Sequence, residues 1–535
     1  MSLFSRSSAL AGAFILAAAS ASAQAPATKS ACDITDAAKG NVARSTLTVD
    51  LARQAGPGPI ASSNLKNAVK LLENGEKGGD EVSRAYVLGT ALSLWLNQPG
   101  ITPVTKRSNL GFTTMPDANI DIVTSLDSLF RIVEAAKPVC TDYTSYYRGG
   151  QKFYLDQVNG AINALNADKL DSAEAYATMA GRLYPASPYS PMVIGSVYSK
   201  RGNSAKAIEY WTRASESAAK DTAYREVRRQ MLTNIGSVQL SSARSASPAE
   251  RAAAARIAAE TYAQLLAVPG TTGSYLYSGR ANYQAAVLMA GDTAAAVTSL
   301  EPLLANPAGY EYQDLLNSAV TAARIGRSAE AAKLFDGVLA QNPNNRDALF
   351  NSAVSFLTLN QNEKVGPVVT RLIAVDPSNP ENYYLAARAY VALGKAARVA
   401  KNIALNAAYN DTSLAWYNRG TKLPVEVTFT EFTPGEKQII VAGSVLDRRE
   451  KADQNAFATP APAKTAKARA AAAVPAVKSY PAKSVTLQFE SLDKSGAVVG
   501  RQSVTTDALT PDKSAKFSVT IVGASAVAFR YTVSP

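Results

Sequence analysis

The chain of 535 residues is 47% hydrophobic, 18% charged and 8% aromatic, and it contains two cysteines and no histidine. At roughly 100–200 residues per domain, this length predicts several structural parts. The lack of histidine excludes a Ser-His-Asp triad, a Cys-His dyad, histidine-ligated metals and an imidazole general base. Carboxylate, lysine or tyrosine chemistry stays open, so an enzyme becomes less expected before any motif is considered.

The first 23 residues have the features of a secretory signal peptide. Arg6 precedes an apolar run over 9–19, and the small residues at 21–23 fit a cleavage site before Gln24. An uncleaved membrane anchor is the alternative, but the run is too short for the roughly 30 Å of membrane hydrocarbon. We therefore expect a mature protein in the periplasm or secreted.

Arg6 is the only charge in the signal peptide, so the mature chain keeps 54 basic and 43 acidic residues, a net charge of +11. This excess favours weak electrostatic contact with an anionic envelope surface such as phospholipid or lipopolysaccharide, but it identifies no ligand. Nucleic acid is not expected as a partner, because an exported chain without a reading motif has little reason to meet it.

Cys32 and Cys140 are expected to form one disulfide, because an exported protein folds in an oxidising compartment. The bond would close a loop of about a hundred residues. Buried free thiols are the alternative. A redox function is not favoured, since the cysteines lack C-x-x-C spacing.

Apolar residues at helical spacing dominate the segment 24–150, which we interpret as a helical cap region. The spacing predicts helices over 64–74, 81–96 and 120–136. Between the last two lies a stretch rich in Pro, Thr, Asn and Gly, over 99–116, which predicts a loop.

From residue 312 onward, equivalent residues recur every 34 positions. The recurring sets are Gly326, Asn360 and Gly394; Ala319, Ala353 and Ala387; Ala331, Val365 and Val399; Phe335, Val369 and Ile403; and Pro343 and Pro377. Each unit is expected to form two antiparallel helices joined by a tight turn. Small residues would lie where the helices cross, and proline would end the second helix.

This pattern resembles the tetratricopeptide repeat (TPR) family. Three consecutive repeats match at 312–345, 346–379 and 380–411. A fourth, at 188–221, has the family's signature residues Gly195, Tyr198, Gly202, Ala207, Trp211 and Ala214. A weaker repeat precedes it, another is plausible at 277–310, and a longer helical pair lies over 222–268. The resemblance implies a right-handed superhelix over 151–421 with a concave inner surface.

By the family's register, the first helix of each repeat lines this inner surface. The residues expected there, which we predict to bind a partner, are Leu316, Asn317, Val320, Phe350, Asn351, Val354, Leu357, Tyr384 and Arg388. They would suit an extended peptide or a helix of a partner protein. Packing between repeats is the alternative role for the two aromatic residues. The carboxylate clamp of some family members is not supported, because Glu381 and Leu385 stand where basic residues are required.

After Leu423 the apolar period changes to two, which is typical of strands. The expected strands cover 425–430, 438–446, 485–490, 497–506, 515–522 and 527–533. Short strands with one apolar face predict a small antiparallel sandwich over 424–535.

Part of this region resembles the FxLYD-like domain, a small β-sandwich of bacterial envelopes. The matching segments are 489–493 with Gly496, then 508–511 and 517–519, while Ser491 replaces the usual aromatic residue. Such domains are generally accessory, so the resemblance implies no chemistry.

An insert rich in Ala, Pro and Lys interrupts the sandwich over 448–483. Such a composition cannot bury enough apolar surface to offset its ordering, so a flexible basic loop is expected. The simplest interpretation is a tolerated insertion. The functional alternative is a tether to an anionic envelope surface through Lys464, Lys467, Arg469, Lys478 and Lys483.

The sequence thus predicts a mostly α fold, a TPR-type superhelix followed by a small all-β sandwich. No catalytic residue, cofactor or metal site is predicted, because no constellation supports one. The leading hypothesis is a non-catalytic periplasmic scaffold that binds a peptide or helix of an envelope protein in the TPR groove. The alternative is a structural envelope protein that contacts membrane or envelope polymer through the sandwich and basic loop.

Overall fold

The computed structural model describes Cys32, Ile34, Thr35, 38–73, 80–435, 437–457 and 478–534. The predicted signal peptide and the central part of the predicted insert, 458–477, lie outside these residues. None of the described helices is long and apolar enough to cross a membrane. The chain divides into two compact units. The N-terminal unit comprises the described residues up to 247 and 260–271, and the C-terminal unit comprises 248–259 and 272–534.

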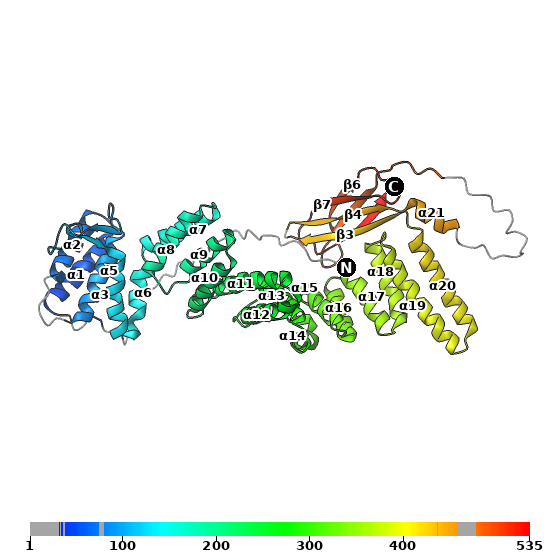
Figure 1. Cartoon of the computed structure of the whole chain (residues 1–535), viewed down its shortest axis with the longest axis horizontal. Helices are drawn as coiled ribbons and strands as arrows, with labels where there is room; N and C mark the ends of the chain where they lie inside the picture. Colours follow the sequence, from blue (N-terminus) through cyan, green and yellow to red (C-terminus); the bar gives the residue numbers. More distant parts are fainter. Residues whose placement is uncertain are drawn as a thin grey trace, which may run out of the picture. The chain divides into compact units, whose positions relative to one another are not determined.

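Helices dominate the N-terminal unit, and neighbours in sequence pair as hairpins (Figure 1). They are α1 (Gly40–Ala55), α2 (Pro59–Glu73), α3 (Glu81–Trp95), α4 (Arg107–Leu110), α5 (Ile122–Ala136), α6 (Thr141–Gly149), α7 (Lys152–Asn166), α8 (Leu170–Leu183), α9 (Tyr189–Lys200), α10 (Ser204–Ala218) and α11 (Arg225–Ser245). Strands β1 (Val104–Lys106) and β2 (Asn119–Asp121) pair antiparallel. The predicted loop over 99–116 therefore contains a strand and the short helix α4.

Close helix contacts in this unit depend on glycine. A Cβ at position 89 of α3 would lie 2.5 Å from Cε1 of Phe130 in α5, and one at position 195 of α9 would lie 2.5 Å from Cδ1 of Trp211 in α10. Distances of this kind are shorter than any normal carbon contact. Gly195 and Trp211, two residues of the sequence signature, thus pack against each other within the hairpin of α9 and α10.

The predicted disulfide is present between Cys32 and Cys140, whose Cα atoms are 5.2 Å apart. Cys140 is fully buried and packs with Ile34, Ala85 and Val133. The bond joins the start of the described chain to the 3₁₀ helix η1 (Pro138–Cys140), which follows α5.

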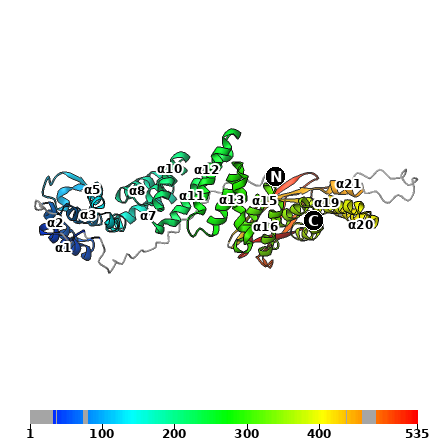
Figure 2. The same cartoon turned by 90° about the horizontal axis from the view of Figure 1, so that it is seen from below.

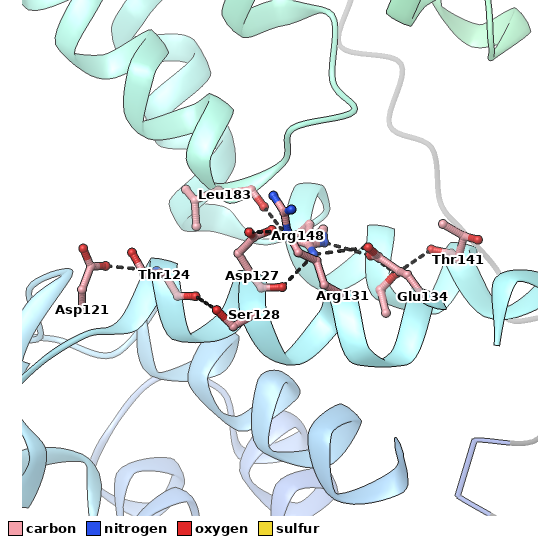
Figure 3. A network of polar contacts seen from close by, with 10 residues as sticks. Asp121, Thr124, Asp127, Ser128, Arg131, Glu134, Thr141, Arg148 and Leu183 are labelled. Atoms are coloured by element: carbon pink, nitrogen blue, oxygen red, sulfur yellow. Dashed lines mark hydrogen bonds and ion pairs between the residues drawn. The ribbon is translucent and has the colours of Figure 1, made fainter. Parts of the chain in front are cut away.

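A buried arginine holds three elements of the N-terminal unit together. The side chain of Arg148, 4% exposed, extends from α6 toward α5 and binds Asp127 at 2.8 Å and Glu134 at 3.0 Å (Figure 3). It also donates to the carbonyl of Leu183 at the end of α8. Because the guanidinium is buried, both carboxylates are needed to offset the loss of its hydration.

The C-terminal unit begins with further helical hairpins. They are formed by α13 (Gly273–Met289), α14 (Thr293–Ala305), α15 (Tyr312–Arg324), α16 (Ser328–Gln341), α17 (Arg346–Thr358), α18 (Val365–Val375), α19 (Pro380–Val399) and α20 (Ile403–Thr421). The last two run side by side in both views (Figures 1 and 2). Helix α12 (Pro248–Leu266) contains residues of both units.

The 34-residue period is correct for the repeats predicted at 312–345 and 346–379. The turns contain Gly326 and Asn360, both with positive φ. The recurring apolar residues of α16 and α18 are fully buried: Ala331, Phe335, Val365 and Val369.

In the repeat predicted at 380–411 the turn does not follow the period, which would place it at Gly394 after the turns at Gly326 and Asn360. Gly394 is buried within α19, and the turn forms at Lys401, with a φ of 57°. Asn402 then caps α20 by accepting the N–H of Leu405 at 3.0 Å. The residues around Gly394 favour helix and offer no cap, so α19 continues. Val399 and Ile403 follow the buried Val365 and Val369 by 34 residues, but they are 82% and 83% exposed at the tip of the hairpin.

Two three-stranded antiparallel sheets follow the helices. One has the order β3 (Val425–Pro434), β4 (Gln438–Asp447), β7 (Ser514–Val522), and the other β6 (Val498–Thr505), β5 (Thr486–Leu492), β8 (Ala528–Ser534). Both contribute to one apolar core, which includes Val427, Ile439, Leu487, Phe489 and Ile521. The predicted fold class, a mostly α helical array followed by a small β-sandwich, is confirmed.

The two described ends of the predicted insert have different structures: the first contains a helix, while 478–482 has no regular secondary structure. Its first part forms the helix α21 (Arg449–Phe457), because Arg449 binds Asp447 through its backbone N–H and its guanidinium. Asp453 of this helix binds Lys478 and the hydroxyl of Tyr480, which fixes the returning chain. Local polar contacts therefore order these ends despite their low apolar content.

Candidate partner-binding surface

The nine residues predicted to bind a partner lie on three neighbouring helices, α15, α17 and α19. We call their surface the first-helix face; its members are Leu316, Asn317, Val320, Phe350, Asn351, Val354, Leu357, Tyr384 and Arg388. These helices follow one another at 34-residue intervals, so equivalent positions recur along the face.

Apolar side chains on this face are only partly covered. Leu316 and Val320 of α15 pack against the core of the α15–α16 hairpin, and Phe350 and Leu357 of α17 pack against the next core, each remaining half-buried. Val354 stands between the two α17 residues and is 37% exposed. Helices α15 and α17 thus each present apolar groups that retain contact with water.

The polar members have different settings. Asn317 is exposed, while the amide of Asn351 donates to the carbonyl of Asp347 in its own helix at 2.8 Å. Arg388 forms a loose ion pair with Glu381 at 3.4 Å, with both side chains more than half exposed. Each therefore has hydrogen-bonding capacity left for a partner.

Tyr384 both packs against a neighbouring helix and contributes to the exposed face, the two roles that the sequence left open for the aromatic residues. Its ring lies 5.4 Å from the ring of Tyr417 in α20, and a Cβ at Gly420 would touch it at 2.8 Å. One side of Tyr384 is thus occupied by the neighbouring helix, while the residue as a whole remains half-exposed.

Sequence reasoning missed one member of this surface, Val391. It follows Leu357 by 34 residues, and it lies three positions after Arg388 and seven after Tyr384, on the same side of α19. It is 41% exposed. The repeat period was the signal that could have identified it.

The sandwich contacts the helical repeats at the loops that precede α17 and α19. Asn342 donates to the carbonyl of Val527 at 3.0 Å, and the guanidinium of Arg346 lies 4.8 Å from the ring centre of Phe429. Ser378 accepts the N–H of Val427 at 3.0 Å. These contacts use helix ends and loops, so they fix the sandwich beside the repeats.

The deepest of these contacts is a buried carboxylate. Asp376 is 2% exposed and accepts the hydroxyl of Tyr531. Burial raises the pKa of Asp376, although Arg346 and the hydrogen bond from Tyr531 oppose that rise. Burial, with the nearby negative charge, also raises the pKa of Tyr531 well above its ordinary value. The carboxylate of Asp376 is therefore engaged within the interface and is not free for a ligand.

Within the described part of the chain, no group of three or more His, Cys, Asp or Glu side chains is placed to hold a metal ion. The raised pKa values belong mainly to tyrosines, and their leading cause is burial in the packed helices, as for Tyr154 and Tyr262. Such tyrosines support packing and carry no indication of a reaction.

No protein-family model matches the sequence, and the comparison with curated proteins gives no match. Solved structures with similar helical arrangements include a tetratricopeptide repeat protein from Parabacteroides merdae, at 15% identity and a TM-score of 0.28, covering 49% of this chain and 98% of that one. The apo form of RapI has 11% identity and a TM-score of 0.28, covering 70% and 96%. YrrB, described as a TPR protein with an unusual peptide-binding site, has 14% identity and a TM-score of 0.21, covering 41% and 83%. At these TM-scores the similarities add nothing to what the helices themselves show.

Proposed function

We propose that the protein is a non-catalytic interaction scaffold of the periplasm, and that its first-helix face binds a peptide or helix of an envelope protein. The observation that carries the proposal is the row of incompletely buried apolar side chains on α15, α17 and α19. An apolar surface that recurs on adjacent helices is typical of an interaction site, because scattered exposed residues have no such order.

The composition of the face defines the expected ligand. Val354 and Val391 offer exposed aliphatic contacts, and half-buried Phe350 lies beside Val354 on α17. Exposed Asn317 supplies an amide, and Arg388 a cation. A peptide with apolar anchors at regular spacing and a free polar backbone or an acidic group would match these features.

The proposed location rests on the sequence features of a signal peptide and is supported by the disulfide between Cys32 and Cys140. Expression of the full chain in a Gram-negative host gives a direct test. We expect the protein in the periplasmic fraction, with Gln24 as its first residue. An uncleaved chain in the cytoplasm would contradict the proposal.

The binding proposal is tested by capture of envelope proteins on the purified chain and on the variant Val354→Glu. A charge at this position should abolish capture through the first-helix face, because a buried carboxylate opposite apolar groups is costly. The matched control is Leu51→Glu on α1, whose wild-type residue is 44% exposed in the N-terminal unit. Circular dichroism checks that both variants fold.

A partner that is lost from Val354→Glu and retained by Leu51→Glu would support the first-helix face. Equal capture by all three proteins would overturn it. In that case the contact would lie elsewhere, and salt-sensitive binding to envelope fractions would favour the sandwich and its basic insert.

A further inference from the structure

A cavity of about 480 Å³ lies in the N-terminal unit, apart from the first-helix face. Its walls come from α5, α8, α10 and the start of α9, so it lies mainly on the second helices of the hairpins. Three arginines line it, Arg131, Arg182 and Arg213, and Asp127 is its one acidic residue. We call it the arginine cavity.

Two carboxylates at the cavity, Asp127 and Asp121, are already engaged. Asp127 binds buried Arg148 at 2.8 Å and Arg131 at 2.8 Å, so one negative charge faces two cations (Figure 3). Arg182 binds Asp121 at 2.5 Å and the hydroxyl of Thr124 at 3.0 Å. The hydrogen bonds from Thr124 and Arg182 outweigh the effect of burial and lower the pKa of Asp121, which therefore stays charged.

Arg213 has a different setting from the other two arginines. Its guanidinium lies 5.1 Å from the ring centre of Tyr210, and among the described residues no carboxylate lies within ion-pair distance of it. The ring of Tyr210 in turn stacks on the ring of Tyr198, with 5.6 Å between the ring centres, and this contact supports the position of Tyr210. The guanidinium edge thus remains available for an anion, while its face is supported by an aromatic ring.

We propose that the arginine cavity binds the carboxylate side chains of an acidic segment in a partner protein. A guanidinium fork matches a carboxylate with two parallel hydrogen bonds. The apolar parts of the wall, Val123, Pro185, Pro191 and Ile194, suit the methylene groups that carry such a carboxylate. The volume accommodates one or two side chains.

An anionic membrane is a poorer match for this surface. Glu209 and Glu216 flank Arg213 on α10 and are exposed, one turn before it and one turn after it. A continuous layer of lipid phosphates would meet these carboxylates as well as the arginine, whereas a single side chain entering the cavity would avoid them.

The test measures binding of a fluorescein-labelled hexaglutamate peptide to the full chain by fluorescence anisotropy, at low salt. A hexaglutamine peptide with the same label is the probe control. The variant Arg213→Gln should bind hexaglutamate at least about tenfold more weakly, because a charge-assisted hydrogen bond is lost. Arg225→Gln, which removes the same charge from an exposed position on α11, should bind as the wild type does.

Three further measurements separate the sources of the anion. Free glutamate and inorganic phosphate, added at equal charge, should compete far less well than the peptide. Phosphatidylglycerol vesicles should be retained equally by wild type and Arg213→Gln. Absence of hexaglutamate binding, an equal loss in Arg225→Gln, full competition by glutamate or phosphate, or vesicle binding that depends on Arg213 would each overturn the proposal.

This inference is independent of the first-helix face. Val354→Glu should leave hexaglutamate binding unchanged, and Arg213→Gln should leave capture through the first-helix face unchanged. Either proposal can therefore fail while the other stands.

Discussion

The hydroxyl of Tyr531, in the last strand of the sandwich, donates a hydrogen bond of 2.7 Å to Asp376, in the loop before the last helical hairpin. The same hydroxyl accepts the backbone N–H of Ser378 at 3.2 Å. Both residues are almost completely buried. The final strand of the chain is therefore part of the packing of the repeats, and the sandwich cannot be regarded as an independent appendage.

Removal of this hydroxyl by Tyr531→Phe should reduce the free energy of unfolding by about 1–3 kcal/mol, because a buried carboxylate and a buried N–H each lose a partner. The measurement is urea unfolding at neutral pH. Tyr417→Phe is the control, since Tyr417 is 51% exposed and its hydroxyl has no hydrogen bond within the described chain. Equal stability of the two variants would show that the interface does not depend on the hydroxyl.

Glu73 at the end of α2 should make folding sensitive to acid. Burial alone would raise its pKa, but hydrogen bonds from the backbone and hydroxyl of Thr113 and from Thr114 lower it from 4.5 to about 2. Arg107 also binds the carboxylate at 3.0 Å. The native state thus prefers the charged form, and the stabilisation is complete above pH 4.5 and is lost as the pH falls toward 2.

We therefore expect Glu73→Gln to be less stable than the wild type at pH 7, with a difference that shrinks between pH 4.5 and 2. Unfolding followed by circular dichroism over this range measures it. The variant Asp117→Asn removes an exposed carboxylate in the same region and should show little change. A constant difference across the range would contradict the assignment.

Gly195→Ala should destabilise the α9–α10 hairpin by about 1–3 kcal/mol, because the added methyl group overlaps the indole of Trp211. A smaller ring at 211 should relieve the overlap, so in the Trp211→Phe background the same substitution should cost less. A double-mutant cycle by thermal unfolding measures this coupling. Additive effects would show that the two residues do not limit each other.

The sequence was sufficient to predict the helices and the sandwich where each residue type in the pattern has a single physical role. Val365 and Val369 are buried because the apolar period matches the α-helix, and the same period applied to α15 and α16 gives the right hairpin. Gly195 and Trp211 were both identified as signature residues of the TPR pattern, and the structure shows that they contact each other. The change to a period of two after Leu423 likewise predicted the sandwich.

The structure differs from the sequence predictions where two local conformations of the chain compete and differ little in energy. The turn forms at Lys401 and not at Gly394, because the residues after Gly394 favour helix and the first N-capping residue after it is Asn402. Helix α21 is held by contacts of Arg449 with Asp447 and of Asp453 with Lys478 and Tyr480, which composition does not reveal.

The arginine cavity was missed for another reason. Arg131, Arg182 and Arg213 are more than 30 residues apart in the sequence, and a charged residue on a helix normally indicates only a solvated surface. Only the packing of α5, α8 and α10 places them around one space. By contrast, most members of the first-helix face could be placed together from the sequence, because residues one repeat length apart lie on neighbouring helices.

The hairpin of α19 and α20 ends in a tip that contributes almost nothing to the folded core, since Val399 and Ile403 are more than four-fifths exposed. Selection for stability therefore places little restraint on this tip. Between Ala400 and Asn402 a short peptide tag or a fluorophore can be inserted at small energetic cost. The tip is thus a convenient attachment point for pull-down or single-molecule work, and it leaves the first-helix face and the arginine cavity unmodified.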